Sequence, residues 1–527
     1  MRGAALIALV MVALAWGTRA SAQLALTNLV EARVGTNPFR PDLPENRNEI
    51  YDLLDLDYTL ASVRLGLRFE SYHQGYESQE FEPGYDAVTQ RYAEWNDEHV
   101  RVRVGNFYTI LGRGLIHRSF QLPGVILDQT LAPSRYSPSR DVDGVLAEAR
   151  WGPIATRAFS GRPNSGEYAP SAAKLLPGFE LYRGLVSGAQ AVGTVWRDAK
   201  LGLGYARLSG EGEGQREFGS TFVELDPLRM AGVNAVQLPI YAEVARENAD
   251  WGREWGIGVG DRDTAAVYAS ANLLWGPATF SAEWKDYRAF RLGSNDPPSL
   301  VREHSYYLLN RSTHFLFADR EEGFQLEGSY TLPAWGTLTL NSTRSDGRNG
   351  KPVRFEERYG ELHLAPRADD RFEGTAFLAR GKDEFLTASV SDRTIAGGAA
   401  TVRILGAWSA NLDLERLEAQ RIDFFGRPVV RYHDQYAVIG VSRADWGSLA
   451  FAWERTTDPD AEDPGDFGTP QVEPNVFTNV VASARLGEHH DATLFAGERR
   501  GGPACTAGTC YVVEPFRGVE LRLTSRF

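Results

Sequence analysis

Stretches of alternating apolar and polar residues recur along most of the chain after residue 23, and the clearest cover residues 62–73, 99–108 and 519–527. Their apolar positions are Val63, Leu65, Leu67, Phe69, Val100, Val102, Val104, Val519, Leu521, Leu523 and Phe527. The polar positions between them include Arg64, Arg68, Glu70, Arg101, Arg103, Glu520, Arg522 and Arg526. A period of two predicts β-strands with two different faces, and no stretch shows a convincing helical period.

The length of these stretches indicates which kind of β protein they form. A soluble β-sandwich also alternates, but its strands are usually shorter than these runs. About 9–11 residues in a tilted strand cross a bilayer. The pattern therefore predicts transmembrane strands.

Several short turns between the predicted strands contain a Trp-Gly pair. These turns are Trp151-Gly152-Pro153, Trp275-Gly276-Pro277, Trp335-Gly336 and Trp446-Gly447. Glycine supplies the backbone freedom of a tight turn. Tryptophan favours a bilayer interface because its ring is apolar while its N–H can hydrogen-bond to water. We predict periplasmic turns with an aromatic girdle; the alternative is ordinary hairpin chemistry in a soluble β protein.

Longer polar segments separate the hairpins. They are residues 36–47, 109–140, 161–184, 209–262, 292–320 and 458–473. Short turns alternating with long loops are typical of an outer-membrane barrel, whose long loops lie outside the cell. The count is about 22 strands, or about 24 if Thr221–Asp226 and Ala235–Arg246 are also strands. The predicted fold is all-β: a single large antiparallel transmembrane β-barrel.

The first residues have the pattern of a secretory signal. Arg2 is followed by an apolar run from Ala4 to Trp16 and by the small residues of Ala20-Ser21-Ala22. A membrane anchor is the alternative, but this run is shorter than the roughly 18 residues that a spanning helix needs. We predict a signal peptide over residues 1–22, a barrel over residues 23–527, and export to the bacterial outer membrane.

Composition narrows the class further. Lys and Arg number 56 against 69 Asp and Glu, a net charge of −13, which argues against a nucleic-acid partner. The two cysteines, Cys505 and Cys510, predict a disulfide that closes a small loop, since the exported compartment is oxidising. A metal site is the weaker alternative, because no histidine or second cysteine pair lies nearby.

A barrel this wide leaves an aqueous lumen unless something fills it. The predicted strands begin almost directly after Gln23, which leaves no room for an N-terminal plug, so any constriction must come from side chains or an infolded loop. Residues 109–140 are the first candidate. Tyr108, Arg113, His117 and Arg118 lie around Gly105, Gly112 and Gly114 and are candidates for the constriction, in which Arg113, His117 and Arg118 would face an anionic solute or an acidic wall. Structural bulges and salt bridges at the rim are the alternative.

The polar face of the clearest strands carries both signs of charge. Arg64, Arg68, Arg101 and Arg103 are interspersed with carboxylates such as Glu70. This mixture fits a wall of paired side chains better than a strongly selective ring. The acidic loop of residues 458–466 has oxygen ligands enough for calcium but lacks the spacing of an EF-hand loop, so a solvated loop is expected there.

Three blocks carry a family resemblance: Val104–Arg118, Asp141–Arg150 and Gly501–Phe527. In these the chain resembles an uncharacterised family of bacterial outer-membrane barrels known only as a domain of unknown function. The resemblance implies a barrel and its location, but no activity. A last strand that ends on Phe527 is also similar to the signal read by the barrel assembly machinery.

No catalytic motif stands out. Neither His-Glu-x-x-His nor Gly-x-Ser-x-Gly occurs, and the nine histidines are scattered. The sequence favours a non-enzymatic, porin-like passive channel for polar solutes, without cofactor or metal and surrounded by outer-membrane lipid. The alternatives are a loop-presenting adhesin, receptor or anchoring platform with a filled lumen, and, less well supported, an outer-membrane hydrolase.

Overall fold

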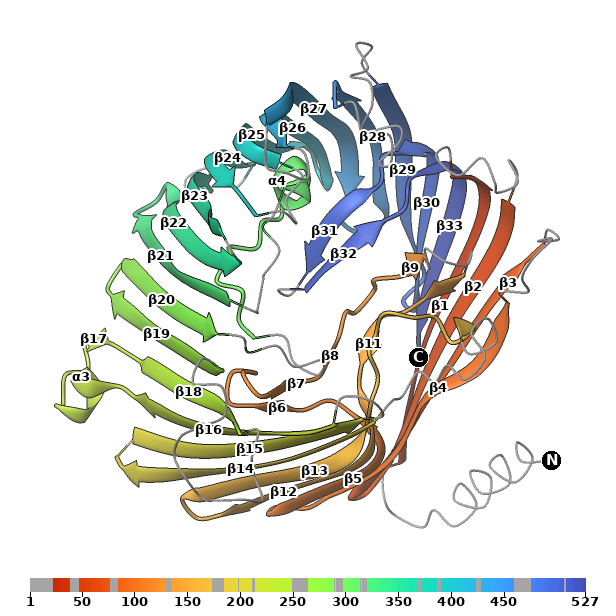
Figure 1. Cartoon of the computed structure of the whole chain (residues 1–527). Coiled ribbons are helices and arrows are strands. Elements are labelled where there is room, and N and C mark those ends of the chain that lie inside the picture. The colour runs from red at the N-terminus through yellow and green to blue at the C-terminus, as the bar shows by residue number, and fades with distance from the viewer. Residues whose placement is uncertain are drawn as a thin grey trace, which may run out of the picture.

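The chain forms one closed antiparallel β-barrel (Figure 1). Its computed structural model describes residues 22–37, 47–75, 84–128, 134–172, 184–197, 199–210, 214–248, 264–288, 290, 297–312, 314, 320–349, 351–366, 371–385, 390–422, 428–458, 475–506 and 509–527. The main sheet has 25 strands, of which β17 (Val236–Gln237) is only two residues long, so that 24 strands build the wall. This confirms the upper of the two predicted strand numbers.

The wall strands follow the chain order around the barrel. They are β1 (Ala22–Thr36), β2 (Arg47–Leu60), β3 (Val63–Gln74), β4 (Tyr85–Asn96), β5 (Val100–Phe107), β12 (Val142–Trp151), β13 (Ile154–Pro163), β14 (Leu185–Trp196), β15 (Ala199–Gly210), β16 (Gly214–Leu225), β18 (Ile240–Asn248), β19 (Ala265–Trp275), β20 (Ala278–Arg288), β21 (Arg320–Leu332), β22 (Gly336–Asn349), β23 (Lys351–Leu364), β24 (Phe372–Asp383), β25 (Val390–Leu405), β26 (Trp408–Ile422), β27 (Pro428–Arg443), β28 (Gly447–Thr456), β29 (Asn475–Leu486), β30 (His490–Arg499) and β33 (Phe516–Arg526). β1 pairs with both β2 and β33, which closes the sheet.

The two faces of the wall differ as the alternation predicted. On β1, Val34 points outward and is 54% exposed, whereas Glu31 and Arg33 point inward and are almost fully buried. Val519 and Leu521 on β33 are exposed on the outside, while Glu520 between them is buried on the inside. The outer face is therefore apolar and the inner face polar, as a lipid-facing barrel requires.

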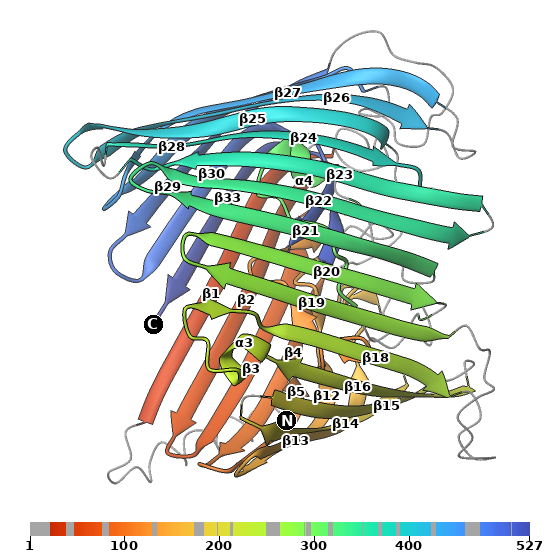
Figure 2. The same ribbon diagram turned by 90° about the vertical axis from the view of Figure 1, so that its left-hand side faces the viewer.

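One end of the barrel carries the short turns, and we call it the turn end. All four predicted Trp-Gly turns lie there, and Trp151, Trp275, Trp335 and Trp446 are all exposed. The longer connections leave the strands at the opposite end, on the right of the side view in Figure 2, and we call it the loop end. The asymmetry of short and long connections is thus confirmed.

The connection between β16 and β18 differs from the other turns. It carries a short helix, α3 (Pro227–Met230), and the strand β17, which pairs beside β18 on β19. The two additional strands predicted within residues 209–262 are present, but as Gly214–Leu225 and Ile240–Asn248. Their bounds shift because a barrel wall needs matched lengths of neighbouring strands, a requirement that local alternation does not express.

The remaining elements lie inside the barrel (Figure 1). They are β6 (Ile110–Leu111), β7 (His117–Arg118), β8 (Phe120–Gln121), β9 (Leu127–Asp128), β10 (Arg135–Tyr136), β11 (Ser139–Arg140), α4 (Tyr307–Arg311), β31 (Gly502–Thr506) and β32 (Thr509–Val513). None of the helices in the described ranges is long and apolar enough to cross a membrane. Several predictions fall outside the described residues: the signal region 1–21, most of the loop 36–47, part of the loop 292–320, and the acidic loop 458–466 beyond Asp458.

We expect the outer face to tolerate charge poorly. Leu340 on β22 points outward and is 57% exposed. Leu340→Arg should destabilise the folded barrel in lipid by about 2–4 kcal/mol, because the guanidinium enters hydrocarbon. Urea unfolding in liposomes measures this cost. Ser329→Arg on the inner face of β21 is the matched control, and an equal loss of stability in both variants would contradict the assignment of the faces.

Candidate functional site in the barrel lumen

Three segments fold from the loop end into the lumen, where they lie against the wall (Figure 1). The first runs from Tyr108 to Asp141, the second from Pro297 to His314, and the third from Arg500 to Pro515. β32 of the third segment contacts β9 of the first, and β31 contacts α4 of the second. The three infolded segments are therefore connected in series.

The first infolded segment leaves and re-enters the wall at one point. It connects β5 to its direct neighbour β12, where Phe107 pairs with Val142. Gly105, Gly112 and Gly114 all have positive φ angles, of 100°, 56° and 93°. At Gly112 a side chain would also collide with the carboxylate of Glu243, since an added Cβ would lie 2.3 Å from its Oε1 atom. These glycines allow the inward fold that the sequence predicted.

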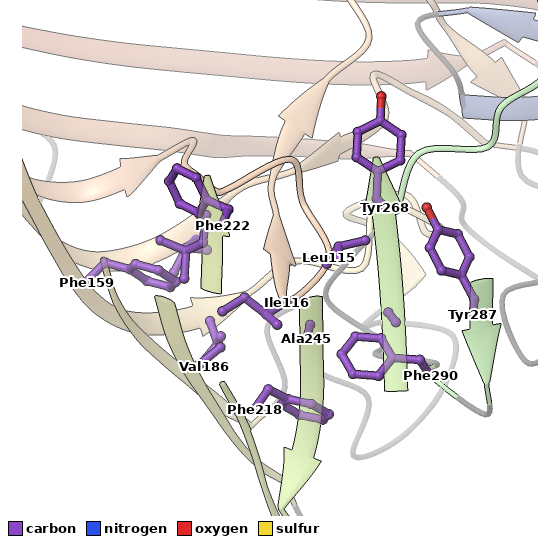
Figure 3. Packing of buried hydrophobic residues seen from close by; sticks show 14 of the residues in the cluster. Leu115, Ile116, Phe159, Val186, Phe218, Phe222, Ala245, Tyr268, Tyr287 and Phe290 are labelled. Carbon is purple, nitrogen blue, oxygen red and sulfur yellow. The ribbon is translucent and has the colours of Figure 1, made fainter. Parts of the chain in front are cut away.

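The tip of the first segment packs on an apolar part of the inner wall. Leu115 and Ile116 are fully buried among wall residues that include Phe159, Phe218 and Phe222 (Figure 3). Burying such a side chain stabilises the docked state by about 1.5–3 kcal/mol. The tip is therefore anchored to the wall.

His117 lies in the same apolar cluster. Its ring is 1% exposed and its centroid lies 4.5 Å from that of Phe159. Burial, together with the nearby charge of Arg157, lowers the pKa of His117 to about 3. The imidazole is thus neutral and faces the wall rather than open lumen.

The other candidates on the first segment also have protein partners. Tyr108 hydrogen-bonds through its hydroxyl to Ser139 Oγ at 2.8 Å and accepts a bond from Gln90. Arg113 donates its backbone N–H to Glu243 Oε2 at 2.9 Å, and its guanidinium lies over the Tyr241 ring. The Arg118 guanidinium lies over Phe120.

The four candidate arginines on the wall all face the lumen beside carboxylates. Arg64 pairs with Asp57 at 3.0 Å, and Arg68 pairs with Asp55 at 2.6 Å. Arg101 lies between Glu94 and Glu148, and Arg103 shares Glu94. The expected wall of paired charges is confirmed on these strands.

A buried ion network holds the second half of the first segment. Asp128 binds Arg33 of β1 at 2.7 Å, and Arg135 binds Glu31 of the same strand at 2.5 Å. Glu31 also binds Arg522 of β33 at 2.6 Å. Burial raises the pKa of Asp128 to about 7, although Arg33 opposes this shift. The network joins the infolded segment to the seam at which the barrel closes.

The inward path of the second infolded segment was not predicted. Tyr307 and Leu308, at the start of α4, donate their backbone N–H groups to Glu415 of β26, each at 2.8 Å. A carboxylate at a helix N-terminus satisfies donors that lack partners within the helix. The Tyr306 ring stacks on Phe377 and the Tyr307 ring on Tyr436.

Two buried histidines of the second segment bind carboxylates of the wall. His304 lies 2.7 Å from Glu357, which also binds Arg393. His314 lies 2.8 Å from Asp383 and stacks on Phe355. Burial disfavours the charged form of His314, but the neighbouring carboxylates outweigh it and raise its pKa.

Arg500 begins the third infolded segment and is its anchor. Its guanidinium contacts Asp434 at 2.9 Å, Glu454 at 3.3 Å and Asp458 at 2.8 Å. Arg311 of α4 reaches the same Glu454 at 3.1 Å. Two infolded segments thus share one carboxylate of the wall.

The predicted cysteine pair lies in the third segment. Cys505 and Cys510 are directly opposed in the β31–β32 hairpin. Opposed residues in an antiparallel pair have Cα atoms about 4.5–5.5 Å apart, which a disulfide can bridge. Their side chains lie outside the described part of the structure, so the disulfide remains a prediction.

A signal for the second and third segments exists in the sequence. Arg302, His304, Arg311, His314 and Arg500 are basic residues within stretches that lack strand alternation. Such residues can bind the carboxylates that the strands turn inward. Among the residues that the structure describes, no three His, Cys, Asp or Glu side chains are grouped to hold a metal ion.

Residues 30–122 match the model of a family of unknown function, DUF6029. The match confirms the predicted resemblance to an uncharacterised outer-membrane barrel family and includes the block Val104–Arg118. The blocks Asp141–Arg150 and Gly501–Phe527 lie beyond it. No curated protein matches the sequence.

Solved structures with a similar fold are bacterial outer-membrane barrels. The translocation pore of the P pilus usher PapC has 10% identity and a TM-score of 0.47, over 96% of this chain and 99% of that chain. Pseudomonas aeruginosa OccK2 (OpdF) in complex with glucuronate has 12% identity and a TM-score of 0.40, over 72% of this chain and 96% of that chain. A BenF-like porin from Pseudomonas fluorescens Pf-5 has 11% identity and a TM-score of 0.39, over 70% of this chain and 94% of that chain. At such low identities and TM-scores, these likenesses say nothing about what this chain does.

We predict that acid loosens the tip of the first segment through His117. In the docked segment the pKa of His117 is about 3, below the ordinary value of 6.5. The contribution of the neutral ring to the free energy of docking is therefore complete above pH 6.5 and is lost as the pH falls toward 3. At about pH 5 the loss is about 2 kcal/mol. Hydrogen exchange of residues 110–121 at about pH 7.5 and about pH 5 measures it.

His117→Phe is the control for this experiment, because it keeps the ring contact and removes the titration. The raised pKa of Asp128 acts in the opposite direction, since protonation favours its docked state. Only the difference between the wild type and the variant therefore reports on His117. An equal pH dependence of both proteins would refute the assignment.

We also expect the cysteine pair to be oxidised. Maleimide should label the denatured wild type only after reduction, because both thiols are then consumed in the disulfide. In Cys505→Ser the remaining Cys510 should react without reduction. Labelling of the denatured, unreduced wild type by mass spectrometry would show that the bridge is absent.

Proposed function

We propose that this chain is a passive conduit for polar solutes across the bacterial outer membrane, and that the three infolded segments narrow its lumen. The observation that carries the proposal is that three long connections at the loop end turn inward. The backbone of these segments lies within the barrel, and polar side chains on them, such as Tyr108 and Arg311, can act on what passes through. No chemical step is part of this function.

The anchoring of the infolded segments supports a permanent constriction. Each segment is held by at least one buried ion pair or carboxylate, such as Asp128 with Arg33, Glu357 with His304, and Asp434 with Arg500. Separating such a pair costs about 3–5 kcal/mol when one partner stays buried. The segments therefore form a lining of the wall rather than mobile loops.

The second candidate is a platform whose infolded segments seal the lumen and whose outer loops bind a partner. The serial contacts from α4 through β31 and β32 to β9 favour it, because they join all three infolded segments into one continuous body inside the barrel. The two candidates differ in one measurable property. A platform conducts no ions, whereas a conduit does.

The location and assembly belong to the same proposal. We infer a signal peptide that is cleaved after Ala22, lipid around the apolar outer face, and recognition of the last strand by the barrel assembly machinery. Phe527 is exposed at the turn end and its ring stacks on His489. An outward aromatic side chain at the end of the closing strand is accessible to an assembly factor.

Single-channel recording of the purified protein in planar bilayers tests the conduit. We expect discrete conductance from the wild type, and a larger conductance from Arg500→Ala, because Asp434, Glu454 and Asp458 then lose the cation that docks the third segment. Arg499→Ala is the matched control. Arg499 pairs with Glu520 on the wall, so its loss should leave the conductance near that of the wild type.

Folding must be verified in the same samples by the heat-dependent mobility of the barrel on gels. A folded wild type without conductance would exclude the conduit and favour the platform. Equal effects of Arg500→Ala and Arg499→Ala would mean that the third segment does not limit the passage.

A further inference from the structure

The inner wall carries two arcs with different electrostatic character. The first arc runs from β33 through β1 to β5 and β12, and most of its described carboxylates form ion pairs with arginines. Its ion pairs include Arg522 with Glu31, Arg64 with Asp57, and Arg101 with both Glu94 and Glu148. Glu94 is shared with a second arginine, Arg103. Most of the charge in this arc is therefore compensated, although Glu70 of β3 has only Tyr51, Tyr85 and the backbone N–H of Ser137 as donors.

The second arc, from β20 to β26, contains carboxylates that no cation compensates. Glu283 accepts a hydrogen bond from the Tyr268 hydroxyl at 2.7 Å, and Glu361 accepts one from Tyr306 at 2.8 Å. Asp413 has a carboxylate oxygen without any hydrogen-bond partner. Within the described part of the chain, none of these three carboxylates has an ion pair with Lys, Arg or His.

The three residues keep some exposure inside the barrel, although the unpartnered Oδ1 atom of Asp413 is itself buried. Glu283, Glu361 and Asp413 are half-buried, whereas the carboxylates that anchor infolded segments, such as Glu357 and Glu415, are buried. A tyrosine hydroxyl is neutral, so its hydrogen bond orients the carboxylate without cancelling its charge. The second arc therefore presents net negative charge to a passing solute.

The width of the barrel makes each arc act separately. With strands about 4.8 Å apart and tilted by about 40°, a barrel of this strand number is roughly 45–50 Å across at its backbone. The Debye length at physiological ionic strength is about 8 Å. The arginines of the first arc are thus too distant to neutralise the field at the second arc.

We infer that the lumen prefers cations, and that its preferred solutes carry an ammonium or other cationic group that travels along the arc from β20 to β26. The inference rests on the conduit function proposed above and adds the charge class of the solute. No single carboxylate is a binding site in this picture. The uncompensated arc as a whole raises the local concentration of cations.

Reversal potentials across a planar bilayer with a gradient of potassium chloride test the inference. We expect the wild type to pass potassium in preference to chloride. Glu283→Gln/Glu361→Gln should lower the permeability ratio of potassium to chloride by roughly twofold, as expected for removing two partly screened charges near the path. Both amides keep an acceptor for the tyrosine hydroxyls, so the wall should fold as before.

Two control variants separate the arc from other effects of charge. Glu98→Gln/Glu488→Gln removes the same charge from exposed turns, and Arg64→Gln/Asp57→Asn removes a neutral pair from the compensated arc. Neither should change the ratio appreciably. Absence of any conductance would refute the conduit itself. Conductance without cation preference, or a ratio that the arc variant leaves unchanged, would overturn the present inference alone.

Discussion

The pairing of β1 with β33 is the constraint on which the rest of the structure depends. In hydrocarbon every backbone N–H and C=O group must find a partner within the protein, and only a closed sheet leaves no edge. The register from Thr27 with Arg526 to Thr36 with Arg517 provides this closure. Because the closed ring contains 24 strands, it encloses a space that its own side chains cannot fill. The infolded segments occupy part of that space.

The carboxylates of the inner wall obtain their hydrogen-bond donors in two ways. Where carboxylates and arginines alternate on neighbouring strands, as with Arg68 and Asp55, the wall satisfies itself. Where carboxylates dominate, the wall is complemented by cations and backbone N–H groups from the infolded segments, as at Glu357 and Glu415. Each buried carboxylate then has a donor, which is the condition for retaining a charge away from water.

The strands were predictable because lipid on one side and polar surroundings on the other impose a period of two, and the Trp-Gly turns because tight turns and interfaces select those residues. The inward turn near Gly105, Gly112 and Gly114 could also be anticipated from the local chain. The docking of Leu115, Ile116 and His117 could not, since a buried histidine beside Phe159 looks the same in sequence as an exposed one. The second segment was missed for a related reason. Its partners, such as Glu415, lie far away along the chain, and a carboxylate on a strand gives no indication of the donor that it will meet.

The ion network at Asp128 and Arg135 has a consequence for the order in which the protein is built. Glu31 comes from the first strand and Arg522 from the last, and Arg135 of the first infolded segment binds the same Glu31. These three side chains can meet only after the final strand has been added and the ring has closed. The complete network is therefore a late product of biogenesis, because one of its side chains belongs to the last strand. The same ion pairs also stabilise the pairing of β1 with β33 from the inside of the barrel. The infolded segment and the closed sheet therefore stabilise one another.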